Sequence, residues 1–196
     1  MVSSDKDQEQ KNITEVKTFP VPFDLEGNQE NITINTNTPS KPSKEQLISQ
    51  AFNFHSQGNI SEAAKYYQEF INQGFKDHRV FSNYGVILND LGKSQEAEKS
   101  TRKAIEIKPD YAMAHMNLGN ILRDLGQLQE AELSYRKAIE IKPDYAEAHY
   151  NLGGILRQLG RYKDAILCSE KTLEIRPWSI QGLYGLNHTC EIESSS

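Results

Sequence analysis

The sequence predicts an all-α fold, a right-handed α-solenoid of helix-turn-helix repeats that follows a disordered N-terminal tail. The first observation is a strict internal repeat: the segment at 107–112 (IKPDYA) returns unchanged at 141–146, which sets a period of 34 residues. The second is a glycine at the same place in each copy, and the third is small residues at helical spacing. A period of this length with no insertion or deletion is typical of solenoids built from helical hairpins.

The period divides the chain into six parts. We expect a disordered polar tail at 1–43, full repeats at 44–77, 78–111, 112–145 and 146–179, and a C-terminal capping helix with a short tail at 180–196. The tail is rich in Asn, Thr, Ser, Glu and Gln, so it has too little apolar surface to offset the entropy of ordering it. Its one apolar island, at 19–23, is a candidate for docking in a groove.

Each repeat reads as two antiparallel helices joined at a glycine. Glycine ends a helix well because it adopts left-handed backbone without a side-chain clash, and it occupies the fifteenth position as Gly58, Gly92, Gly126 and Gly160. In the repeats from 78 onward a proline after the second helix stops that helix, at Pro109, Pro143 and Pro177. Small residues recur where neighbouring helices must approach, at Gly119, Gly153, Ala97, Ala131, Ala165, Ala104 and Ala138.

Two positions predict helix starts. Ser43 with Gln46, and Asp144 with Glu147, have the reciprocal spacing of a capping box, in which each side chain satisfies a free backbone amide. We therefore expect the folded array to begin at Ser43.

The repeat resembles the tetratricopeptide repeat (TPR). The resemblance covers 44–179 and is carried by Asn117, Leu118, Gly119, Ala131, Tyr135, Ala138 and Pro143. The first repeat departs most, with Gln50 and Ala51 for the Leu-Gly pair and Phe75 for the last proline. The resemblance implies a protein-protein interaction scaffold that binds a peptide or protein segment in a concave groove lined by the first helices.

The resemblance also identifies candidate binding residues on the first helices. Asn83, Asn117 and Asn151 share the sixth position of their repeats. They resemble the asparagine ladder in the TPR region of O-linked N-acetylglucosamine transferase. An amide side chain both donates and accepts hydrogen bonds, so such a row suits a peptide backbone. Candidate contacts around the row are Tyr150, Arg123, Arg157, Asn120 and Met116.

Charge and hydropathy narrow the partner class. The net charge of -5 divides into -3 for 1–43 (four Lys, seven Asp or Glu) and therefore -2 for the rest. A nearly neutral array gives no electrostatic reason to bind nucleic acid or membrane, which reward clustered Lys and Arg. No secretory signal and no long apolar run occur in the sequence, so we expect a cytoplasmic protein with both cysteines free.

No catalytic motif, cofactor motif or metal-ligand cluster is apparent, so we expect neither an enzyme nor a cofactor-binding protein. His115 and His149 share the fourth position of adjacent repeats, too far apart for one metal ion, and are interpreted as packing residues. The alternative function is the substrate-presenting TPR region of a glycosyl- or sulfotransferase whose catalytic domain is absent from this chain. The sequence does not identify the partner or pathway, and it favours a monomer without fixing the oligomeric state.

Overall fold

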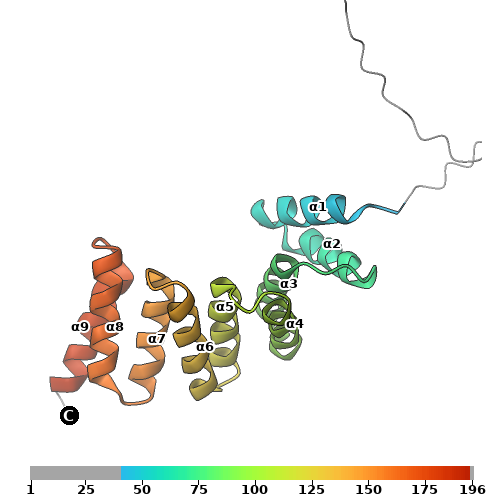
Figure 1. Cartoon of the computed structure of the whole chain (residues 1–196). Helices are drawn as coiled ribbons and strands as arrows, with labels where there is room; N and C mark the ends of the chain where they lie inside the picture. The colour runs from blue at the N-terminus through green and yellow to red at the C-terminus, as the bar shows by residue number, and fades with distance from the viewer. Residues whose placement is uncertain (1–40, 195–196) are drawn as a thin grey trace, which may run out of the picture. The chain divides into compact units, whose positions relative to one another are not determined.

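The computed structural model describes residues 41–194, and within this range it contains nine α-helices and no strand (Figure 1). The predicted tail and its island at 19–23 lie outside the described residues, except for 41–43. The helices are α1 Lys44–Ser56, α2 Ile60–Asn72, α3 His78–Asp90, α4 Ser94–Ile107, α5 Ala112–Asp124, α6 Leu128–Ile141, α7 Ala146–Gln158, α8 Tyr162–Ile175 and α9 Ile180–Ser194. The all-α solenoid fold is confirmed.

Consecutive helices form hairpins that stack in chain order. The turn within each hairpin contains a glycine with φ between 72° and 75°, at Gly58, Gly92, Gly126 and Gly160. A side chain would be strained in this backbone, which explains the residue choice. The first helices lie side by side, since α5 contacts both α3 and α7, and α7 contacts α9. The first helices α3, α5, α7 and α9 therefore form one continuous face of the array.

The core lies between the helices of each hairpin and between neighbouring hairpins. Ala97, Ala131 and Ala165, at one position of successive repeats, are fully buried. A Cβ added at Gly119 would lie 2.5 Å from Cε1 of Tyr135, whose ring is itself fully buried. The small residues of the repeat are thus the places where helices approach most closely, as the sequence predicts.

One of the two predicted capping boxes is present. The Ser43 hydroxyl accepts from the backbone amide of Gln46 at 3.2 Å, and the Gln46 side chain accepts from the backbone amide of Ser43 at 2.8 Å. The prediction at Asp144 is wrong, because α7 begins at Ala146 and Tyr145 is its N-cap without a side-chain bond. Glu147 sits too early in this helix to reach back, and its carboxylate contacts Arg176 at 3.3 Å instead.

The helix α9 closes the described array by packing on α8 and α7. Gly182 allows this close approach, because an added Cβ would lie 2.9 Å from the side chain of Leu173. Across the part of the chain that the structure describes, every helix is too short or too polar to cross a membrane.

Candidate functional site

The asparagine row, defined as Asn83, Asn117 and Asn151, lies on α3, α5 and α7 at the same position of each helix. The amide nitrogen of each side chain donates to the preceding part of the array. Asn83 Nδ2 lies 3.5 Å from Oη of Tyr67 on α2, and Asn117 Nδ2 lies 3.1 Å from Oγ of Ser82 on α3. The row therefore links successive repeats, a role that sequence reasoning did not foresee.

Asn117 differs from the other two members of the row in its burial. It is only 6% exposed, and Ser82, its partner, is fully buried. The reason is that both residues lie where α3 and α5 are in contact. Asn83 and Asn151 are half-buried, so they are the members of the row that a ligand can reach.

Asn120 connects two successive repeats through the hydrogen bonds of its side chain. Its Oδ1 accepts two hydrogen bonds, from Oη of Tyr135 at 2.8 Å and from Nδ2 of Asn151 at 3.0 Å. Its Nδ2 lies 3.3 Å from the sulfur of Met116. Asn120 and Met116 are thus half-buried and held by contacts within the array.

The remaining predicted contacts lie toward the C-terminal end of the face. Tyr150 is half-buried, and its ring lies beside α9, where a Cβ added at Gly185 would be 3.8 Å from its Cε2. Arg157 Nη1 donates to Oγ1 of Thr189 on α9 at 3.3 Å. Arg123 is exposed and pairs with Asp124 at 3.0 Å. Of these three side chains, Arg123 is the most accessible.

A small pocket at the N-terminal end of the face was not predicted. It has a volume of about 250 Å³ and is lined by Phe52, His55, Ser56, Tyr67 and Asn83. His55 Nδ1 lies 3.0 Å from Oη of Tyr67. Burial raises the pKa of Tyr67 to about 12, although the bond from Asn83 opposes this shift, so the hydroxyl stays protonated at neutral pH. The sequence contained a signal for this pocket, because Phe52 and His55 occupy the ninth and twelfth positions of the first repeat, the positions that the candidate contacts Asn120 and Arg123 occupy in the third.

Family models of the tetratricopeptide repeat match the chain over residues 78–111 and 146–177, and further TPR models match 101–132 and 119–156. The chain carries tetratricopeptide repeats. The matches run without a gap from 78 to 177 and contain all the predicted contact residues. No curated protein sequence matches the chain.

Solved structures share the fold at low sequence identity. The MamA protein superposes with a TM-score of 0.69 at 22% identity, over 77% of this chain and 82% of MamA. YrrB, described as a TPR protein with an unusual peptide-binding site, gives a TM-score of 0.65 at 20% identity, over 72% of this chain and 73% of YrrB. A chain of the APC/C hetero-tetramer Cut9-Hcn1 gives a TM-score of 0.70 at 19% identity, over 75% of this chain and 30% of that chain. At these identities the likeness concerns the fold alone.

The two histidines at the fourth position of the TPRs make the same contact in successive repeats. Nε2 of His115 lies 2.8 Å from the carbonyl oxygen of Pro109, and Nε2 of His149 lies 2.9 Å from that of Pro143. Each ring thus ties a first helix to the loop before it, which fits the packing role expected from the sequence. Among the residues described, no group of three His, Cys, Asp or Glu side chains is arranged to hold a metal ion.

Proposed function

We propose that this TPR array binds a peptide or protein segment along the face formed by α1, α3, α5 and α7. The observation that carries the proposal is the arrangement of the asparagine row. Each Nδ2 is used within the array, while the Oδ1 atoms of Asn83 and Asn151 accept no hydrogen bond from the described residues. An amide oxygen in this position is suited to accept from the backbone N–H groups of an extended chain.

Two likenesses support the same mode of binding. The row resembles the asparagine ladder in the TPR region of O-linked N-acetylglucosamine transferase, on which the prediction of backbone contact was based. YrrB, which shares the fold, is described as having a peptide-binding site. We propose that the present chain uses the backbone contact for affinity, with Asn83 and Asn151 as the accessible members of the row.

We propose that side chains around the row select the ligand. Arg123 is exposed and sits beside Asn120, so it is placed to pair with an acidic group of the ligand. Tyr150 offers part of an aromatic ring, and Arg157 lies seven residues, or about two helical turns, further along α7. The pocket lined by Phe52 and Tyr67 has a volume and two aromatic walls that suit one ligand side chain.

The test uses peptides selected from a displayed random library against the full chain, measured by titration calorimetry. Arg123 has a matched control in Arg102, which lies on α4, a second helix. Their side chains are 40% and 47% exposed, and each pairs with a carboxylate. We expect Arg123→Ala to weaken the binding of an acidic selected peptide by about tenfold. Arg102→Ala should leave the affinity within about twofold.

The asparagine row is tested separately by the double variant Asn83→Ala, Asn151→Ala. Asn117 is left intact because its buried bond to Ser82 supports the fold. Each lost hydrogen bond contributes on the order of 0.5–1.5 kcal/mol, so the affinity for any selected peptide should fall roughly tenfold. The proposal fails if both the double variant and Arg123→Ala bind as the wild type does, or if Arg102→Ala weakens binding as much as Arg123→Ala.

A further inference from the structure

The C-terminal end of the array exposes a group of large apolar side chains. Trp178, in the loop before α9, is 93% exposed, and Ile180, Leu183 and Tyr184 on α9 are 82%, 48% and 60% exposed. We call these four residues the α9 surface. Water contact at four large apolar side chains is unfavourable, and clustered exposure of this kind marks a surface that another molecule covers.

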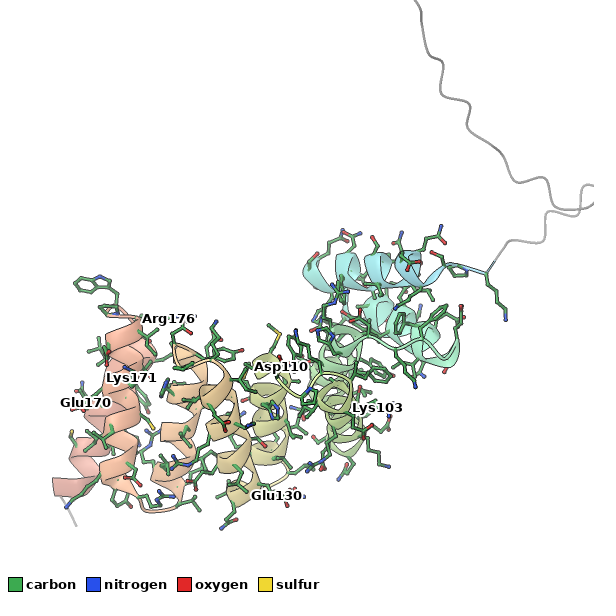
Figure 2. All side chains as sticks on the ribbon, viewed as in Figure 1. Lys103, Asp110, Glu130, Glu170, Lys171 and Arg176 are labelled. Carbon is green, nitrogen blue, oxygen red and sulfur yellow. The ribbon has the colours of Figure 1, made fainter. Side chains whose placement is uncertain are left out.

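The four side chains form one continuous patch. Ile180, Leu183 and Tyr184 have the i, i+3, i+4 spacing that places residues on one side of a helix. Trp178 joins them because it lines, together with Pro177 and Ile180, an open groove of about 490 Å³ that begins at Arg176. Figure 2 shows Arg176 at the end of α8 from which this loop leaves. At the other end of the patch, the Tyr184 ring stacks on His188 with centroids 5.6 Å apart.

The four side chains of the patch are uncharged, and Arg176, which lines the groove beside Trp178, pairs with Glu147 at 3.3 Å. No Asp, Glu, Lys or Arg occurs between Ile180 and Cys190, in a chain of which 25% of residues are charged. In a two-fold symmetric contact each residue near the axis faces a copy of itself, so any charge there meets a like charge. An uncharged apolar patch is therefore suited to self-association, whereas it offers no charge by which to select a different partner.

The area of the patch suits a small dimer contact. A buried aromatic side chain covers about 150–250 Å², so Trp178 and Tyr184 at their observed exposure offer on the order of 300 Å². With Ile180 and Leu183 the patch reaches on the order of 500–600 Å², or roughly 1,100 Å² summed over two copies. Specific contacts start at about 1,000 Å² in total, which places this one at the weak end of the range.

We propose that the α9 surface binds the same surface of a second copy of this chain and forms a two-fold dimer. This departs from the expectation of a monomer based on the sequence. None of the four side chains belongs to the asparagine row, although Tyr184 holds on α9 the position that Tyr150 holds on α7, one repeat of 34 residues earlier. Dimerisation would join two arrays at their C-terminal ends and so give the assembly two peptide-binding faces.

The test is the mass of the full chain by sedimentation equilibrium from about 1 µM to about 200 µM, a range that brackets micromolar dissociation constants. A reducing agent is present because Cys190 is exposed. We expect the wild-type mass to rise from 22.3 kDa toward twice that value. Trp178→Glu and Tyr184→Glu should stay monomeric throughout the range, because each places like charges at the contact.

The control is Leu133→Glu, which adds the same charge at a leucine on α6 that is 68% exposed. It should dimerise as the wild type does. Circular dichroism checks that each variant folds. Trp178→Glu changes a residue in the loop between α8 and α9, so it alters no helix. The proposal is overturned by a wild type that stays monomeric, by dimers that persist in both α9-surface variants, by equal loss in Leu133→Glu, or by masses well above a dimer. Loss of the dimer on deletion of 1–40 alone would assign the contact to that segment and would also overturn it.

Discussion

The close packing of α5 on α6 makes a sharp prediction about two glycines. Gly119 and Gly154 both lie inside first helices, on α5 and α7, and both should gain about 0.8–1.0 kcal/mol of helix stability when replaced by alanine. Their surroundings differ. A Cβ at Gly154 would have only Arg157 Nη2 within reach, at 4.0 Å, whereas a Cβ at Gly119 would lie 2.5, 2.7 and 2.8 Å from three atoms of the Tyr135 ring.

The Tyr135 ring has little room to move, because it is fully buried and its hydroxyl donates to Asn120. Overpacking of a buried site costs about 1–3 kcal/mol, and loss of the Asn120 bond costs about 0.5–1.5 kcal/mol more. After the gain in helix propensity, Gly119→Ala should lower the free energy of unfolding by about 1–3 kcal/mol. Gly154→Ala should raise it by about 0.5–1 kcal/mol.

Urea unfolding followed by circular dichroism compares both variants with the wild type. At about 2–4 °C per kcal/mol, the melting temperatures should also separate by several degrees. Equal stability of Gly119→Ala and Gly154→Ala would show instead that the Tyr135 ring moves aside at no cost in free energy. A stability change confined to the slope of the urea transition would instead indicate altered cooperativity between repeats.

Three further predictions concern single buried groups. Thr101 Oγ1 is buried without a hydrogen-bond partner in the described structure, so Thr101→Val should raise the urea-unfolding free energy by about 1 kcal/mol. Burial raises the pKa of the Cys168 thiol to about 11, so Ellman's reagent at about pH 8 should modify exposed Cys190 at least about tenfold faster than Cys168. Burial raises the pKa of Tyr67 and of Tyr135 from 10.0 to about 12, so the folded state holds both protons more tightly than the unfolded state. The protonated tyrosines therefore contribute fully to the free energy of unfolding below pH 10, and this contribution is lost as the pH rises toward 12. The loss should be about 1–3 kcal/mol per tyrosine, measured by urea unfolding at about pH 8 and pH 11.5.

The elements that could be predicted from sequence are those fixed by local chemistry. Gly58 and its equivalents terminate helices because of backbone conformation, and the alanines at the closest helix approaches are set by size. The glycine conformation is a local property and the small residues recur once in each repeat, so a 34-residue period reveals both. The capping-box prediction failed at Asp144 because a shift of one residue in the helix start removes the geometry, and the sequence spacing alone does not fix that start.

The candidate site could be predicted in position but not in its contacts. The register correctly placed the asparagine row on the first helices, yet the bonds from Asn117 to Ser82 and from Asn151 to Asn120 join different repeats. Such bonds depend on the distance and rotation between neighbouring hairpins, which the sequence of one repeat does not specify. The same holds for the exposure of Trp178, which depends on how α9 packs against α8.

The measurement that tests the central proposal most directly is a nuclear magnetic resonance titration of the isotope-labelled full chain with a selected peptide. We expect shifts in the side-chain amide signals of Asn83 and Asn151 and in backbone signals of α1, α3, α5 and α7. Signals from the outward sides of α2, α4, α6 and α8 should stay in place. Shifts confined to those second helices or to residues 1–40, with the asparagine signals unchanged, would contradict the account.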